Sequence, residues 1–232
     1  MHPGLNKFKK GLIVSCQAFP GDPMFGEGIM AKMALAAKQG GAVGIRANGR
    51  ADIESIKAVV DLPVIGIVKR KYSDSEINIT PTLREVQELG EAGADMIALD
   101  ATGRRRPNGE TLESLIAYIH DVLGLPVMGD VSTLEEAKQA QSLGVDVVAP
   151  TLAGYTPYTE MTDGPDWQLL EAMLSELSIP VMAEGRIQTP EDARRAFRAG
   201  CRNVVVGAAI TRPEWITERF VTIMTAEEVK HD

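Results

Sequence analysis

The chain has 232 residues, 44% of them hydrophobic, and 32 acidic residues outnumber 24 lysines and arginines. A chain of this length and hydrophobic content can bury a sizeable core, while its net charge of −8 argues against binding to nucleic acid, whose phosphates it would repel. The two cysteines, Cys16 and Cys201, form no CxxC pair, so neither a disulfide framework nor a zinc site is expected and a reducing cytoplasm fits.

The segment KFKKGLIVSCQ near the amino terminus has basic residues, an apolar run and then Cys16, as a lipoprotein signal would. The apolar run of residues 11–15 is too short for the hydrophobic region of a signal peptide. A first buried strand explains it better. No run of about 18 apolar residues occurs elsewhere, so no membrane span is expected.

A recurring unit follows, in which a helical pattern ends in glycine and a short run rich in valine and isoleucine comes next. The copies lie at residues 83–100, 134–150 and 190–207. In each helical part, apolar residues recur at spacings of three and four, and the glycine is typical of a helix end. Apolar runs without alternation are typical of strands covered on both faces.

Eight strands and eight helices are predicted in this way. Thr82 and Thr133, each followed three residues later by glutamate, predict capping boxes, and Thr189 before Pro190 predicts an N-cap. The predicted strands are 11–17, 42–46, 63–69, 95–100, 126–130, 146–150, 180–184 and 203–207, and the predicted helices are 25–39, 51–59, 82–92, 110–121, 133–143, 165–177, 190–199 and 212–224.

Eight such units average about 29 residues each, near the lower range of a (β/α)8 TIM barrel. A doubly wound sheet is the competing fold, and for a dinucleotide it would need a glycine-rich turn after the first strand. The segment SCQAFPGDPMFGEG contains no GxGxxG. No linker divides the chain, so we predict a single TIM-barrel domain that spans residues 1–232.

In such a barrel the functional site lies at the carboxyl ends of the strands, and seven of the eight predicted strands close on a polar residue. Each has a structural alternative: Asp100 and Asp130 could cap the loops that follow them, and Arg46 could pair with a neighbouring acid. The seven residues are Gln17, Arg46, Lys69, Asp100, Asp130, Thr151 and Glu184.

Lys69 and Glu184 stand apart from the other polar ends because each follows a strand predicted to be covered on both faces. A buried charge without a partner is costly. We therefore expect the two side chains to meet each other or a charged ligand. A purely structural ion pair is the alternative.

The loops after strands seven and eight, EGRIQTP and VVGAAITRP, predict a phosphate site, because many barrels hold phosphate there. Gly185 and Gly207 allow backbone amides, including that of Ala208, to approach an anion closely. Arg186 or Arg212 is expected to add a bidentate contact. Ordinary turn geometry is the alternative for the two glycines.

None of the three histidines, His2, His120 and His231, closes a strand, so a histidine-ligated metal or a histidine base is not expected at this end. A partly desolvated lysine has a lowered pKa and can remove a proton from carbon next to a carbonyl. A neutral lysine can instead form a Schiff base, as in barrel aldolases. Sequence spacing does not separate these two reactions.

Eight segments that together cover nearly the whole chain up to Met224 resemble the bacterial N-acetylmannosamine-6-phosphate 2-epimerases of sialic acid catabolism. The lysine motif and the GYTPY loop are the most specific of them, whereas the glycine after strand eight is generic. The segments are GLIVSCQA (11–18), GAVGIRANG (41–49), LPVIGIVKRKY (62–72), ADMIALDAT (94–102), MGDVST (128–133), LAGYTPYT (152–159), MAEGRI (182–187) and VVVGAAITRP (204–213).

The resemblance implies a (β/α)8 barrel that interconverts N-acetylmannosamine 6-phosphate and N-acetylglucosamine 6-phosphate without a metal or other cofactor, and that forms a homodimer. It implies that Lys69 is the catalytic base and acid and that Glu184 is its partner. Contacts with the sugar and its N-acetyl group are implied for Gln17, Arg46 and Asp130, and contacts with the phosphate for Arg212 and the amides of the last two loops. With Thr151 and Arg186, these are the predicted substrate-binding residues.

Two other functions remain open at this point. One is a Schiff-base aldolase or lyase that acts on a sugar phosphate. The other is a phosphosugar-binding barrel without catalysis, against which the intact set of polar strand ends argues only weakly.

Overall fold

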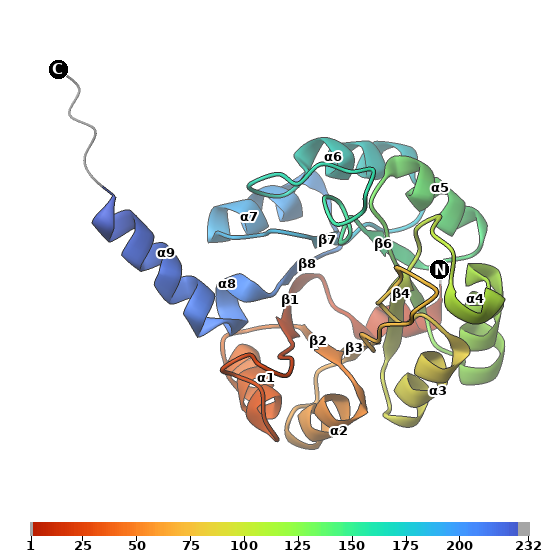
Figure 1. Cartoon of the computed structure of the whole chain (residues 1–232), viewed down its shortest axis with the longest axis horizontal. Coiled ribbons are helices and arrows are strands. Elements are labelled where there is room, and N and C mark those ends of the chain that lie inside the picture. Colours follow the sequence, from red (N-terminus) through yellow and green to blue (C-terminus); the bar gives the residue numbers. More distant parts are fainter. Residues whose placement is uncertain (1, 227–232) are drawn as a thin grey trace.

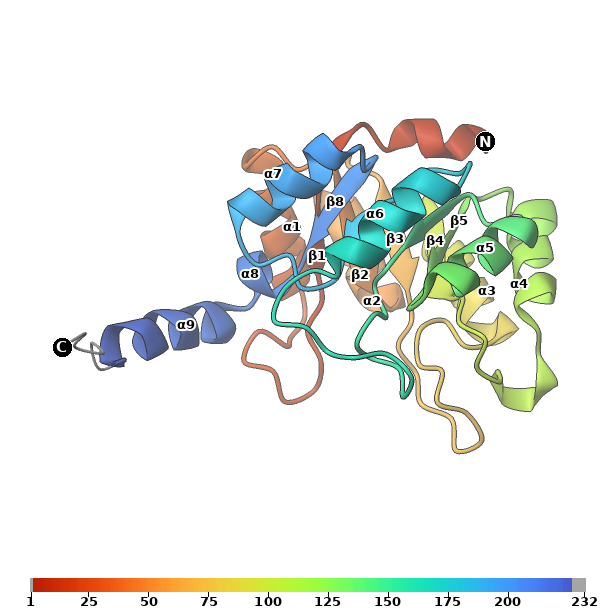
Figure 2. The same ribbon diagram turned by 90° about the horizontal axis from the view of Figure 1, so that it is seen from above.

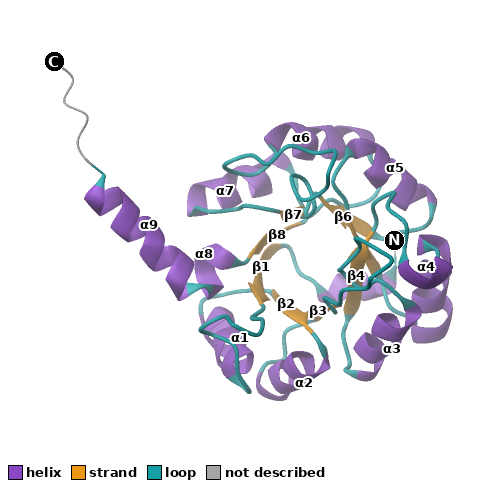
Figure 3. Cartoon of the chain, viewed as in Figure 1, coloured by secondary structure: helices purple, strands orange, loops and turns teal. Residues whose placement is uncertain are grey.

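Eight parallel strands line the centre of the molecule and helices surround them, as the view along the barrel shows (Figure 3). The structure is a computed structural model that describes residues 2–226. The strands are β1 (Gly11–Cys16), β2 (Gly44–Asn48), β3 (Val64–Ile67), β4 (Met96–Asp100), β5 (Val127–Asp130), β6 (Val147–Ala149), β7 (Ala183–Glu184) and β8 (Asn203–Val206).

The sheet closes on itself. Its strand order is β6-β5-β4-β3-β2-β1-β8-β7, with every pair parallel. The remaining gap is bridged by Val148 of β6, which pairs with Val181 just before β7, and the Met182 amide donates to the Val148 carbonyl at 2.9 Å. A closed parallel sheet surrounded by helices confirms the predicted (β/α)8 barrel.

The helices form the outer ring in Figure 1, and none of those described is long and apolar enough to cross a membrane. The capping boxes at Thr82 and Thr133 and the N-cap at Thr189 are confirmed. The α-helices are α1 (Ile29–Gln39), α2 (Arg50–Val59), α3 (Leu83–Glu91), α4 (Leu112–Tyr118), α5 (Leu134–Ser142), α6 (Trp167–Glu176), α7 (Pro190–Ala199), α8 (Ala208–Thr211) and α9 (Pro213–Thr225); shorter turns are η1 (Pro3–Lys7), η2 (Pro107–Gly109) and η3 (Ile119–Leu123).

Two predicted boundaries were wrong. Strand β2 begins and ends two residues later than expected, so Arg46 lies in its middle and not at its end. Helix α1 begins only at Ile29, because Gly28 before it has a φ of 71° and interrupts the helical backbone. The predicted helix 212–224 corresponds to α9, and the short α8 before it was not predicted; the extended φ and ψ of Arg212 separate the two.

The turn η1, which the sequence did not predict, covers the amino end of the barrel. Its Leu5 and the following Phe8 are fully buried and belong to the core inside the barrel. The side chain of Asn203 at the start of β8 donates to the Lys9 carbonyl at 2.7 Å and so ties this segment to the sheet. Figure 2 shows η1 at one end of the barrel and the long loops at the other, where the strands end.

Helix α9 extends away from the barrel in both views (Figure 1, Figure 2). None of its residues is buried, and its apolar side chains Phe220, Ile223 and Met224 are 67%, 73% and 81% exposed. Large apolar groups seldom stay uncovered in this way. The last residues, 227–232, including His231, lie outside the described part of the chain.

Candidate active site

A cavity of about 620 Å³ opens at the carboxyl ends of the strands. Most of the predicted site residues line it, which follows from the geometry of parallel barrels, because all eight strands end at the same rim. Arg46 and Asp130 lie beneath this lining and are almost fully buried. The predicted residues in the lining are Gln17, Lys69, Thr151, Glu184, Gly185, Arg186, Gly207, Ala208 and Arg212.

A buried ion-pair cluster built around Arg46 forms the floor of the cavity. Nη2 of Arg46 lies 2.5 Å from Oδ2 of Asp130, and Nη1 lies 2.5 Å from Oε2 of Glu184. The Thr151 hydroxyl donates to Asp130 at 2.8 Å. Arg46 is 1% exposed, so the two carboxylates replace the water that its guanidinium has lost. This planar cation with parallel donors fixes the orientation of both carboxyl groups.

Of the two partners expected for Lys69 and Glu184, each other or a charged ligand, the first is not found in the described part of the chain, and a charged ligand stays a prediction. Glu184 pairs with Arg46, and no ion pair of Lys69 is found among residues 2–226. Arg46 pairs with Ile65, a residue of the core inside the barrel, so its side chain lies on the interior face of the sheet, where it reaches both carboxylates.

Glu184 has an unusual protonation equilibrium. Burial raises the pKa of its carboxyl group, the charge of Asp130 raises it further, and the charges of Arg46 and Lys69 oppose the rise, which leaves the pKa at about 7. A carboxyl group with such a pKa exchanges a proton readily near neutral pH.

We expected Lys69 to lie in a covered part of the barrel, and this expectation was wrong. It follows the end of β3, and its side chain is open to solvent within the cavity. Its Nζ lies 4.9 Å from the centre of the Phe19 ring. Displacement of water by the surrounding protein lowers the pKa of Lys69, and the positive charge of Arg46 lowers it further. Both shifts favour a neutral amine, the form that accepts a proton.

Gln17 follows β1 and offers an unused hydrogen-bonding group. Its amide nitrogen donates to the Ser15 hydroxyl at 2.7 Å. Its Oε1 is buried and has no hydrogen-bond partner in the described part of the chain. An orphaned acceptor in a cavity wall is suited to a substrate hydroxyl or amide.

The loops after β7 and β8 shape one side of the cavity. Gly185 has a φ of 118°, and a Cβ there would lie 3.2 Å from the Pro150 carbonyl oxygen, so both conformation and space require glycine. Gly207 precedes α8, which begins at Ala208. Arg212 lies beside them, 40% exposed, with Asp22 as a distant partner at 3.7 Å.

Arg186 is placed differently from Arg212. Its guanidinium donates to the carbonyls of Ala153 at 2.6 Å and Gly164 at 2.9 Å, and to the Thr162 hydroxyl at 3.0 Å. These acceptors all belong to the loop between β6 and α6. Most of its hydrogen-bond donors are thus occupied by the loop, so the structural role of Arg186 is to hold that loop beside the cavity.

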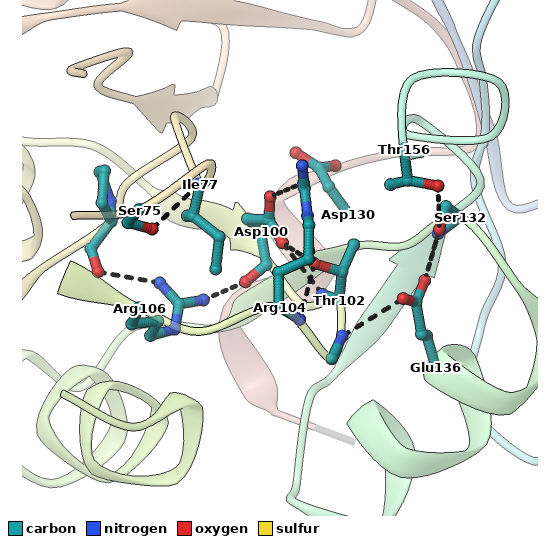
Figure 4. Close-up of polar contacts among 12 residues, drawn as sticks. Ser75, Ile77, Asp100, Thr102, Arg104, Arg106, Asp130, Ser132, Glu136 and Thr156 are labelled. Atoms are coloured by element: carbon teal, nitrogen blue, oxygen red, sulfur yellow. Dashed lines mark hydrogen bonds and ion pairs between the residues drawn. The ribbon is translucent and has the colours of Figure 1, made fainter. Parts of the chain in front are cut away.

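Asp100 at the end of β4 caps the loop that follows it, which was the structural alternative given for this residue. It accepts hydrogen bonds from the Thr102 amide at 3.0 Å and from Arg104 at 2.5 Å, and so caps its loop. Figure 4 shows Asp100 between Arg106 and Thr102. Arg104, like Phe19 and Tyr155, lines the cavity but was not predicted, because it lies inside a loop and not at a strand end.

No group of three or more histidine, cysteine, aspartate or glutamate side chains arranged to hold a metal ion occurs among residues 2–226. Metal-free chemistry stays a prediction.

The fold and the site define a barrel enzyme whose cavity combines a lysine, a protonatable carboxyl group and glycine-bearing loops. The chain belongs to the N-acetylmannosamine-6-phosphate epimerase family, because the family model described as "Putative N-acetylmannosamine-6-phosphate epimerase" matches residues 30–226. Membership of this family makes it an isomerase of the epimerase class.

Its relatives extend over nearly the full chain. A protein of Clostridioides difficile (strain 630), described as a "Putative N-acetylmannosamine-6-phosphate 2-epimerase", is 55% identical over 94% of this chain and 97% of its own. A solved N-acetylmannosamine-6-phosphate 2-epimerase from Clostridium perfringens is 52% identical, covers 96% of both chains and has a TM-score of 0.93. A thiamine phosphate pyrophosphorylase from Pyrococcus furiosus, at 18% identity over 92% of both chains and a TM-score of 0.58, shares the fold alone.

Proposed function

We propose that the chain interconverts N-acetylmannosamine 6-phosphate and N-acetylglucosamine 6-phosphate, as an N-acylglucosamine-6-phosphate 2-epimerase. The observation that carries the proposal is the pair Lys69 and Glu184, which line one cavity with pKa values displaced toward neutrality from opposite sides. Such a pair suits proton removal and return at one carbon.

The chemistry starts from the open-chain sugar, whose aldehyde at carbon 1 acidifies the proton on carbon 2. Neutral Lys69 takes that proton, and the electron pair of the broken C–H bond moves to the carbonyl oxygen as an enolate. Donors in the cavity, among them the ammonium of Lys69 itself, stabilise the new negative charge. Return of a proton to the other face of carbon 2 inverts the centre.

Glu184 is suited to serve the second face. With a pKa of about 7 it is partly protonated at neutral pH and can deliver a proton, while Arg46 holds its orientation. A route in which Lys69 serves both faces differs in one measurable respect. In the two-base route, Glu184→Gln loses epimerisation but still exchanges the carbon 2 proton, whereas with one base exchange and epimerisation fall together.

The phosphate is assigned to the loops after β7 and β8. Gly185 and Gly207 leave room for an anion next to the backbone amides, including that of Ala208, and Arg212 supplies a cation at the same rim. Gln17 and Thr151, which line the cavity wall, are assigned to the sugar and its N-acetyl group together with the deeper Arg46–Asp130 pair. Binding of the unreacting phosphate positions carbon 2 against Lys69.

One experiment tests this function directly. The protein is incubated with N-acetylmannosamine 6-phosphate in deuterated water and followed by proton NMR. We expect resonances of N-acetylglucosamine 6-phosphate to appear and the carbon 2 proton to be replaced by deuterium. A borohydride-trapped adduct at Lys69 would favour a Schiff-base aldolase or lyase instead, and binding without turnover would favour a non-catalytic phosphosugar-binding barrel.

We also propose that the chain forms a homodimer through α9. The support is the exposed apolar surface of Phe220, Ile223 and Met224 on a helix that extends from the barrel. Light scattering coupled to gel filtration should give twice the mass of one chain. Phe220→Glu with Ile223→Glu should give a monomer, whereas a wild-type monomer would contradict the proposal.

A further inference from the structure

The backbone that carries Lys69 leaves the barrel wall after β3 and returns before α3, and its two arms pair with each other. Lys69 on the outgoing arm forms an antiparallel bridge with Ile79 on the returning arm. The Thr80 amide donates to the Val68 carbonyl at 2.8 Å, on the residue that precedes Lys69. The position of the Lys69 side chain therefore depends on where the returning arm is anchored.

Thr80, which anchors that arm, has an unfavourable backbone conformation. Its φ is 45°, in the left-handed region that β-branched residues rarely adopt. It also precedes Pro81, which disfavours a positive φ at the preceding residue. Thr80 is fully buried. Such a conformation persists only where the surroundings hold it, and it is often found at functional sites.

The Thr80 hydroxyl makes two of the bonds that hold this conformation. It donates to the Ala98 carbonyl of β4 at 2.6 Å and accepts from the Val68 amide at 3.3 Å. Val68 is thus bonded to Thr80 through both its amide and its carbonyl. The hydroxyl links the residue next to Lys69 to a central strand of the barrel.

Arg106 holds the same turn from the other side. Arg106 is 4% exposed, and its guanidinium donates to the carbonyls of Thr80 at 3.2 Å and Pro81 at 3.0 Å. It also donates to the Asp100 carbonyl at the end of β4, and Figure 4 shows it directed there. Asp100 returns a contact, because its amide donates to the Ile79 carbonyl at 3.0 Å. Both fixed points of the returning arm thus lie on β4.

We propose that Thr80, held in its left-handed conformation by Arg106 and β4, is a positioning residue that sets the place of the Lys69 side chain in the cavity. The proposal rests on the proposed function, in which Lys69 is the base. Without the hydroxyl the arm loses one of its two direct links to β4, keeping only that between Asp100 and Ile79, and the Lys69 amine moves relative to carbon 2 and to Arg46. The rate of proton removal then falls while the binding surface for the sugar phosphate is retained.

Three substitutions of Thr80 separate positioning from folding. Thr80→Val keeps the branched shape and removes the hydroxyl, and we expect kcat to fall at least 10-fold with KM changed less than threefold. Thr80→Ser keeps the hydroxyl and should stay within threefold of wild type. Thr80→Gly also lacks the hydroxyl, but glycine adopts a positive φ without steric cost. It should fold, and its kcat should fall as in Thr80→Val.

The pH dependence of kcat/KM separates positioning from a purely structural role, because a purely structural role of Thr80 would leave it unchanged. Release of Lys69 from the vicinity of Arg46 should raise its apparent pKa in kcat/KM toward the ordinary value of lysine, and deuterium uptake at carbon 2 should slow in parallel. Thr111→Val is the matched control, because Thr111 caps α4 outside the cavity and accepts from the Ser114 amide at 3.2 Å. It should lower Tm but leave kcat and the pH profile unchanged.

The outcomes distinguish the two proposals. If Lys69→Met still exchanges the carbon 2 proton at the wild-type rate, the assigned base is wrong and the role of Thr80 is wrong with it. If Lys69→Met is inactive but Thr80→Val and Thr80→Gly both retain wild-type kcat and pH profile, the proposed function stands and the positioning role of Thr80 is refuted.

Discussion

Replacing Arg46 with methionine tests the electrostatic structure of the cavity floor. The substitution keeps much of the side-chain stem but removes the cation that lies 2.5 Å from both Asp130 and Glu184. Loss of one partner from a buried ion pair costs about 3–5 kcal/mol, because the remaining charges stay buried and uncompensated. We expect Arg46→Met to lose about that much free energy of unfolding at pH 8.

The pH dependence of this loss follows from Glu184. Its folded pKa of about 7 already exceeds the ordinary value of 4.5. The folded state therefore binds more protons than the unfolded state between these values, and stability from this group falls as pH rises through 7. Removal of Arg46 raises the folded pKa further, so protonation of Glu184 relieves part of the loss. Each further unit of pKa changes the free-energy difference between protonated and ionised Glu184 by about 1.4 kcal/mol.

Urea unfolding of both proteins at pH 6 and pH 8 measures the effect. Arg46→Met should be less destabilised at pH 6 than at pH 8, and Asp130→Asn added to it should recover part of the stability. Arg50→Met, which breaks the exposed pairs with Glu54 and Glu91, is the control and should be nearly neutral. An Arg46→Met loss that is equal at both pH values would refute the assigned coupling between Arg46 and Glu184.

The other predictions concern turnover and the stability of the loop between β6 and α6. Lys69→Met should fold and bind substrate but lose roughly 10²–10⁴-fold in kcat, with carbon 2 deuterium exchange reduced in parallel. Arg212→Ala should raise KM and lower kcat, because remote phosphate binding positions the reacting carbon; wild-type kinetics would assign the phosphate to Arg186 or to backbone amides. Arg186→Ala should increase proteolytic cleavage between residues 150 and 166, since its guanidinium holds that loop; an unchanged cleavage pattern would contradict this role. EDTA should leave activity unchanged, and a loss restored by a divalent ion would contradict a metal-free mechanism.

Local patterns in the sequence determined the architecture of this protein. Apolar runs without alternation, helices that end in glycine, and caps such as Thr82 and Thr133 depend on interactions within a few residues, so they are visible in the chain itself. The rule that parallel barrel strands end at one rim then placed Gln17, Lys69 and Glu184 around one cavity. That these three residues line the same cavity could therefore be predicted without knowing how the side chains pack.

Tertiary structure alone decided which side chains pair. Arg46 lies on the interior face of the sheet beside Ile65 and pairs with Glu184, so Lys69 does not make that contact, which was one of the two expected for it. The loop between β6 and α6 engaged Arg186, and β4 held Thr80 in a conformation that its own residue type disfavours. Such contacts join residues far apart in the chain, and their energies depend on register and burial, which exist only once the barrel has closed.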